Sequence, residues 1–227
     1  MTILTIADAI QIVRKNLDEV GLNDSQMFGE NTDNAQLDSV ITDTLPEAIN
    51  SINRNAPVEL LEGLTETFAE GQEGEAAQTS VLQINNQVGT FTIANGDVLR
   101  LLFCKASDSE IVVSAIEEMS AIGRQQANQY VRGTFDKPVL VRTQADHNTF
   151  KYYSFKEDTA TPQIKATYIP VCYLGSSSAL YVSETETQAE GYYVSPLVKD
   201  SILNQLTAMV LSIYGETDRA GLFQSRV

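Results

Sequence analysis

Few side chains in this sequence are suited to acid–base or nucleophilic chemistry. His147 is the single histidine among 227 residues. The sequence therefore predicts neither a Ser-His-Asp triad, nor a Cys-His pair, nor a metal site built from several histidines. His147 follows Asp146 in a stretch that is typical of a turn, so we expect an exposed side chain. A proton switch at an interface is the functional alternative.

The two cysteines, Cys104 and Cys172, also lack the spacing of a reactive site. Neither belongs to a C-x-x-C pair, which excludes the usual zinc and thiol-redox arrangements. Both lie among apolar residues in stretches that are typical of strands. We therefore expect two reduced thiols in the core and no disulfide between them.

Carboxylates are abundant, with thirty Asp and Glu residues, but most fall in polar loops or on helix faces. The chain has no Trp, a common platform for sugars. Residues 31–34 lack the alternating ligands and central glycine of a calcium loop, and residues 71–74 lack the lysine of a phosphate loop. The sequence predicts a protein that is not an enzyme and has no cofactor or metal. An enzyme acting through loop carboxylates is a weaker alternative.

Two tyrosine doublets are the aromatic features that could serve recognition, Tyr152-Tyr153 and Tyr192-Tyr193. In an extended chain, neighbouring side chains point to opposite faces of the sheet, so a sheet buries only one ring of each pair on its own core side. One interpretation is a core ring beside a surface ring. Because tyrosine is enriched at protein interfaces, a contact between subunits is the alternative.

The C-terminal residues 215–227 form a short polar tail after a glycine that is typical of a helix end. A chain end of this kind is commonly disordered. The alternative is that the tail becomes ordered on assembly, with Leu222 and Phe223 as anchors and with Arg219 and Arg226 meeting acidic surfaces of a partner.

These residues must be positioned by a helical layer from the two chain ends. Residues 5–21 carry an apolar stripe behind a capping threonine, and residues 32–55 continue helical spacing with Pro46 as an expected kink or break. Residues 195–214 form a long apolar helix, with Ser195 as the expected cap. We assign the helical layer to residues 1–56 and 195–214.

The middle of the chain is typical of β-structure. Residues 57–78 are acidic and contain glycines, which indicates a linker, and residues 79–194 then predict a β-rich antiparallel insertion. Three sequential strands are expected at residues 81–84, 88–94 and 98–105, with a turn at Asn95-Gly96. Later strands are expected at residues 138–143, 150–155 and 164–174. Strands in a run between terminal helices predict an α+β fold.

The charge of the chain is strongly acidic and unevenly distributed. Residues 1–75 hold three basic and fifteen acidic residues, which gives −12 of the total of −15. Tight nucleic-acid binding depends on Lys and Arg, so this balance argues against it. No apolar run approaches the ~20 residues of a membrane span, and the N-terminus lacks the pattern of a signal peptide.

Four segments within residues 94–139 form a distinctive pattern: N-G-D-V-L-R-L-L at 95–102, S-D-S-E at 107–110, R-Q-Q-A-N-Q-Y at 124–130 and V-R-G-T-F-D-K-P-V at 131–139. This stretch resembles structural proteins of tailed bacteriophages, in particular head-to-tail adaptor or ring proteins of crAss-like phages. Terminal helices around a β-rich insertion, with a polar tail, are also similar to podovirus adaptors that dock beneath the portal.

The resemblance implies a virion protein of the phage neck, made in the cytoplasm of the bacterial host. Its subunits would form a closed head-to-tail ring of about twelve copies, contacting the portal and other tail or ring proteins. Genomic DNA would pass through the lumen without specific binding, because acidic walls repel phosphates. The alternative is an acidic, monomeric binding module without enzymatic activity.

Overall fold

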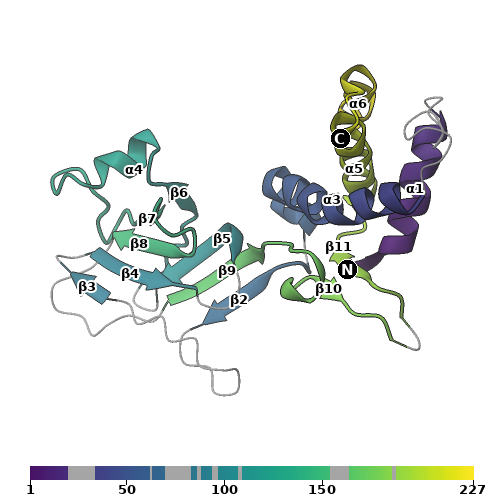
Figure 1. Ribbon diagram of the computed structural model, residues 1–227. Coiled ribbons are helices and arrows are strands. Elements are labelled where there is room, and N and C mark those ends of the chain that lie inside the picture. Colours follow the sequence, from purple (N-terminus) through teal and green to yellow (C-terminus); the bar gives the residue numbers. More distant parts are fainter. Residues whose placement is uncertain are drawn as a thin grey trace. The chain divides into compact units, whose positions relative to one another are not determined.

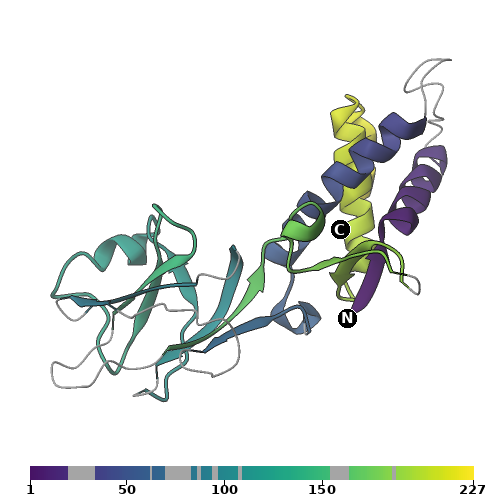
Figure 2. The same ribbon diagram turned by 60° about the horizontal axis from the view of Figure 1, so that its bottom comes forward.

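The computed structural model describes residues 1–19, 34–61, 63–69, 83–85, 88–93, 97–106, 109–153, 164–185 and 188–227. The fold is α+β, as the sequence predicts, with five α-helices and three β-sheets in the described part of the chain. Two compact units are present: Met1–Leu64 together with Val171–Val227, and Thr65–Pro170 (Figures 1 and 2). We call them the helical unit and the β unit.

The boundaries of the β unit differ from those of the predicted insertion. The sequence places the insertion at 79–194, but the unit begins at Thr65 and ends at Pro170. Strand β2 (Glu66–Ala69), which lies in the predicted acidic linker, pairs with β9 (Ile164–Pro170) and so belongs to the β unit. Residues 70–78 of the linker lie outside the described residues. Residues 171–194 return to the helical unit because their strands pair with the N-terminus.

The helical unit is built around three helices that contact one another in every pair. These are α1 (Ile6–Glu19), α3 (Asn34–Asn55) and α5 (Lys199–Ile213), and α6 (Thr217–Gln224) packs on α5. Helix α1 begins as the sequence predicts, since Thr5 Oγ1 accepts the backbone N–H of Asp8 at 3.0 Å. The expected end of this helix, at residue 21, lies outside the described residues.

Helix α3 runs through Pro46 without a break, where the sequence predicts a kink or a break. Proline in a helix interior costs about 3 kcal/mol because a backbone hydrogen bond is lost. The surrounding side chains Leu45, Ala48 and Ile49 are fully buried. Each large buried aliphatic side chain contributes roughly 1.5–3 kcal/mol, so packing offsets the loss at Pro46.

Helix α5 begins at Lys199, four residues after the predicted cap Ser195. The strand before it extends to Val194, so the chain must first turn. In this turn the backbone N–H of Val198 donates to Ser195 O at 3.2 Å. At the other end Gly215 has φ +83°, and the N–H of Glu216 donates to Leu211 O at 2.9 Å. This glycine-terminated cap confirms the predicted helix end.

A small sheet in the helical unit was not predicted. Its strands are β1 (Thr2–Thr5), β11 (Gly191–Val194) and β10 (Tyr181–Val182), paired antiparallel with β11 in the centre. The last strand expected from the sequence was at residues 164–174. A side chain at Gly191 would place its Cβ 2.4 Å from Leu4 O, so glycine permits this close strand pairing. Short 3-10 turns, η1 (Val58–Leu61) and η2 (Gly175–Ser177), complete the unit.

The β unit contains two sheets. The first has the order β2-β9-β5, with β5 at Val98–Ala106. The second has the order β3-β4-β8-β7-β6, all antiparallel except the parallel pair β6·β7. Its strands are β3 (Gln83–Asn85), β4 (Val88–Thr92), β6 (Ala115–Glu117), β7 (Val139–Arg142) and β8 (Thr149–Tyr153).

The predicted run of three sequential antiparallel strands is wrong at its third member. Strands β3 and β4 pair, but β5 pairs with β9 in the other sheet. Leu101 and Leu102 are adjacent on β5 and are both buried, so this strand needs cover on both faces. The expected Asn95-Gly96 turn lies outside the described residues.

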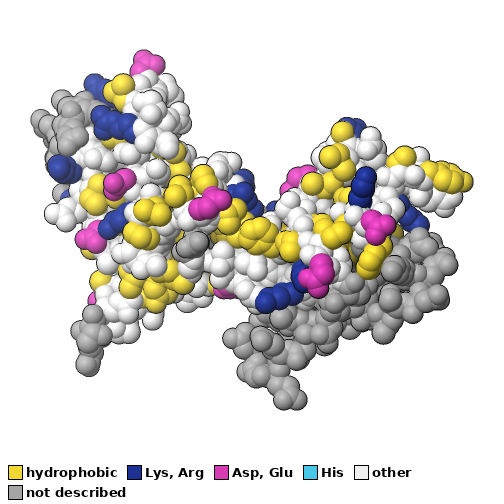
Figure 3. All heavy atoms as spheres, turned by 180° about the vertical axis from the view of Figure 1, so that it is seen from behind, with side chains coloured by type: hydrophobic (Ala, Val, Ile, Leu, Met, Phe, Trp, Pro, Cys, Tyr) yellow, Lys and Arg dark blue, Asp and Glu magenta, His cyan; other side chains and the backbone are white. Residues whose placement is uncertain are grey.

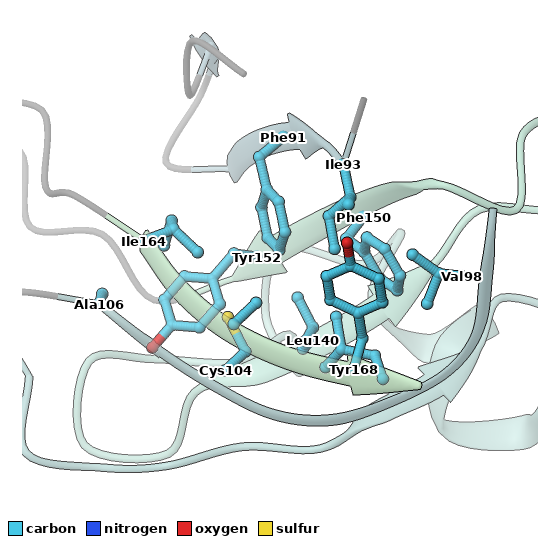
Figure 4. Packing of buried hydrophobic residues seen from close by; sticks show 12 residues of the cluster. Phe91, Ile93, Val98, Cys104, Ala106, Leu140, Phe150, Tyr152, Ile164 and Tyr168 are labelled. Carbon is cyan, nitrogen blue, oxygen red and sulfur yellow. The ribbon is translucent and has the colours of Figure 1, made fainter. Parts of the chain in front are cut away.

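Both sheets contribute to one core in the β unit, shown in Figure 4. Phe91 of β4 and Phe150 of β8 stack with their ring centroids 5.4 Å apart, and Cys104 of β5 is fully buried. The other members are Ile93, Val98, Leu101, Ala106, Leu140, Tyr152, Ile164, Ala166 and Tyr168. This core holds strands β6 and β7 in place, and the candidate site is the segment that connects them along the chain.

Candidate interaction surface

The connection between β6 and β7, residues 118–138, is the most prominent candidate; we call it the α4 loop because it contains helix α4 (Ala121–Gln125). The two strands it joins are parallel, with Ala115 opposite Leu140. Parallel neighbours cannot be joined by a tight hairpin, so the chain must cross back along the sheet. The topology therefore requires a long connection at this place (Figure 1).

The first half of the loop is tightly built. Ser120 caps α4: its Oγ accepts the N–H of Gly123 at 3.0 Å and donates to Glu117 O at 2.6 Å. A Cβ added at Gly123 would lie 2.4 Å from Glu117 O, so only glycine allows α4 to approach the end of β6 this closely. Helix α4 is thus held directly against the sheet.

The second half is held by a buried amide. Gln126 is 4% exposed; its Nε2 donates to Ile122 O at 3.0 Å and its Oε1 accepts the N–H of Gly133 at 2.7 Å. Between these anchor points, Asn128 Oδ1 accepts the N–H of Tyr130 at 3.0 Å. The amide of Gln126 ties the two sides of the loop together, and Asn128 fixes the backbone at its tip.

An ion pair anchors the start of the loop to the sheet. Glu118 Oε2 accepts the backbone N–H of Gln144 at 2.9 Å, and Glu118 Oε1 accepts from Lys151 Nζ at 2.9 Å. The bond from the Gln144 N–H, together with that from Lys151, holds the pKa of Glu118 below its usual range. Glu118 is therefore ionised at neutral pH and links the loop to β8 and to the chain after β7.

This rigid frame displays apolar side chains to solvent. Tyr130 is 85% exposed, Met119 58%, Ile122 55% and Val131 57%. In Figure 3, which shows the molecule from behind, hydrophobic and basic atoms lie together on the part of the β unit that projects at the upper right. Exposed Tyr and Met held on an ordered loop are typical of a surface that binds another protein.

The charge of the loop contrasts with that of the chain. The α4 loop contains three basic residues, Arg124, Arg132 and Lys137, and two acidic ones, Glu118 and Asp136, which gives +1, whereas the whole chain carries −15. Arg124 is exposed in the last turn of α4. The α4 loop thus combines apolar contact area with positive charge.

This surface was not among the candidate sites predicted from the sequence, although a signal was present. Tyr130-Val131 is an apolar pair between polar and basic residues, in a stretch without strand alternation or helical spacing. Such a pair belongs to no apolar face that could pack in a core, so the pattern is typical of two exposed side chains.

The tyrosine doublets lie elsewhere than on an open surface. Tyr152 and Tyr192 are fully buried, Tyr153 is 9% exposed and Tyr193 is half-buried. The first interpretation, a core ring beside a ring nearer the surface, describes Tyr192-Tyr193, whereas both rings of Tyr152-Tyr153 are buried. Both faces of β8 are therefore covered at this doublet, since neighbouring side chains of a strand point to opposite faces. The alternative of a contact between subunits stays a prediction. Tyr192 also accepts the N–H of Gly175 at 3.0 Å through its hydroxyl.

The C-terminal tail is a docked helix and not a polar segment without contacts. Phe223 of α6 is 1% exposed, and Arg226 lies over its ring at 5.1 Å from the centroid. Arg219 contacts Glu216 at 3.8 Å, while Leu222 is 56% exposed. Because α6 turns one face to α5, Phe223 is unavailable to a partner and only Leu222 of the two apolar residues is accessible.

The remaining chemistry-bearing residues lie apart. The two cysteines are free and buried, as predicted, and burial raises the pKa of both Cys104 and Cys172 to about 12. His147 lies exposed in a turn, also as predicted. Among the described residues, no group of three or more potential metal ligands occurs, and no helix is long and apolar enough to cross a membrane. Residues 31–33 and 71–74, considered as ion or phosphate loops, are outside the described part.

A scan of the chain against protein-family models gives no match, and a search of curated proteins gives no significant match.

Proposed function

We propose that the chain is a virion structural protein, a subunit of a head-to-tail connector ring that joins the portal of a tailed phage to its tail. In this proposal the helices near the two chain ends form one layer, and the β-rich unit is inserted between them. One observation carries the proposal: the rigid α4 loop displays Tyr130, Val131 and Ile122 at its surface. The loop, residues 118–138, lies within the stretch 94–139 that resembles phage ring proteins.

The α4 loop is both exposed and ordered, as a subunit contact requires. A ring subunit needs side chains that are exposed in the free chain and buried in the assembly, and they must be held in place so that little ordering entropy is lost on binding. The Gln126 and Ser120 hydrogen bonds supply that order. The α4 loop meets both requirements.

Charge supports the second part of the proposal, passage of DNA through a ring. The helical unit holds six basic and seventeen acidic residues, which gives −11, and the β unit holds nine and thirteen, which gives −4. Tight DNA binding requires Lys or Arg side chains that displace counterions from the phosphates. Acidic walls lack this contribution, so DNA can slide past them. The ring would contact the portal and other tail or ring proteins in the virion.

The test is electron microscopy of the purified chain, alone and after co-expression with the portal protein of the same phage. Rings, or a complex of this chain with the portal ring, support the proposal. A chain that stays monomeric by light scattering and does not join the portal overturns it and favours an acidic binding module.

A further inference from the structure

We propose that the α4 loop binds a second copy of this chain, at a surface of the helical unit formed by Asp43, Glu47, Tyr173 and Leu174; we call this the acceptor surface. The inference rests on the proposed ring function and assigns the contact that would build the ring. The proposed partner is a neighbouring identical subunit.

The acceptor surface is defined by helix α3 and the segment after β9. Asp43 and Glu47 are exposed on α3, four residues apart, and Asn50 follows on the same side of the helix. Asn50 Nδ2 donates to Cys172 O at 2.8 Å, and its Oδ1 accepts the N–H of Cys172 at 2.7 Å. These two hydrogen bonds fix the backbone of Cys172, directly before Tyr173, against α3.

Those following residues are apolar and exposed. Tyr173 is 37% exposed and Leu174 is 51% exposed. The acceptor surface therefore presents two carboxylates next to an aromatic and an aliphatic side chain. Both residues directly follow Cys172, whose backbone is bonded to Asn50 of α3.

The two surfaces are complementary in both respects. The α4 loop offers Tyr130 and Val131 with Arg124 nearby in the chain, while the acceptor surface offers Leu174 with Glu47. Opposite charges at the rim orient a contact, and the buried apolar centre supplies most of its affinity. The helical unit carries a net charge of −11, which is opposite in sign to that of the α4 loop.

The contact is heterologous, because the loop lies in one unit and the acceptor surface in the other. One copy bound to the next leaves a free loop at one end and a free acceptor surface at the other. Such contacts repeat until a ring closes, which is the symmetry that the proposed function requires. A nucleic-acid partner for the loop is disfavoured, since tight binding needs several phosphate contacts.

Disulfide trapping tests the contact directly. Gln129 beside Tyr130 and Ser176 beside Leu174 are both exposed, and the native cysteines are buried. Chains carrying Gln129→Cys are mixed with chains carrying Ser176→Cys at the highest soluble concentration and oxidised. We expect a mixed dimer, and a ladder of higher oligomers when one chain carries both changes. The control pairs Gln129→Cys with Ala145→Cys, an exposed position of the β unit.

Reversing the charges of the two surfaces is the second part of the experiment. Arg124→Glu in the Gln129→Cys chain should lower the yield of mixed dimer at least about fivefold, and Glu47→Lys in the Ser176→Cys chain should restore it. Equal yields for the control pair, or no effect of Arg124→Glu, overturn the inference. If rings or portal complexes still form in that case, the proposed function stands and the ring uses another contact. If none form, both fail.

Discussion

Replacing Phe223 by Ala should detach the last helix from the helical unit. Phe223 is 1% exposed, and in the eight-residue helix α6 it is joined in the buried face only by Ala220. An isolated helix of this length is not stable in water, so α6 exists because it is docked on α5. Removing a buried phenylalanine side chain costs about 3–5 kcal/mol. That is comparable with all the burial that holds α6 in place, so we expect the helix to undock while α5 stays folded.

Urea unfolding followed by the helical circular dichroism signal, together with amide hydrogen exchange, measures this effect. Phe223→Ala should lower the stability of the helical unit and remove protection from the amides of α6. A chain ending at Gly215 should show the same loss, because both changes remove the same contact. Leu222→Ala is the matched control: that side chain is 56% exposed, so the change should stay within about 0.5 kcal/mol. If the two alanine variants were indistinguishable, the docking of α6 deduced from burial would be refuted.

Three further outcomes follow from burial and charge. Leu206→Asp should unfold the helical unit, since Leu206 is fully buried and an unpaired carboxylate there costs several kcal/mol; a thermal melt like that of the unchanged chain would contradict this. Thiol reagents should label Cys104 and Cys172 only after unfolding, as expected for buried thiols with a pKa of about 12, and fast labelling of folded protein would show otherwise. The N–H of Gln144 lowers the pKa of Glu118, so its anchoring is fully present above the ordinary pKa of 4.5 and is lost as pH falls through the lowered value. Once the intrinsic slowing of amide exchange in acid is corrected for, protection of the Gln144 amide should fall over that range, and Glu118→Gln should make this protection less dependent on pH.

The helices were predictable because their apolar spacing records burial directly. Val13 and Leu17 of α1, and Ile202 and Leu206 of α5, recur at four-residue steps and are all buried. The start of α5 was misplaced, since a Ser-Pro pair is compatible both with a helix start and with the turn that it forms. Local chemistry at Ser195 does not decide between them; the strand that ends at Val194 does.

The pairing of strands was less predictable because it depends on residues far apart in the chain. Strands of two to four residues, such as β10 and β1, carry too few side chains to show alternation. Strand β5 was located but assigned to the wrong partner, since proximity in sequence favours hairpins, whereas β5 pairs with β9, which is far from it in the chain. Sheet membership is thus a tertiary property even where the strand is evident locally.

The candidate surface shows the same division between local and tertiary information. The sequence offered the tyrosine doublets as an alternative contact surface, but Tyr152 and Tyr192 lie in the cores of their units, while Tyr130, in a loop, is exposed. What distinguishes Tyr130 is its support: a buried glutamine, Gln126, holds the loop closed from inside while the aromatic ring stays outside. A side chain with only a packing role would be buried. A residue on a flexible surface loop would lack the support of a buried amide. Since order without burial is what a binding site requires before its partner arrives, the hydrogen bonds of Gln126 point to recognition more directly than the exposed ring alone.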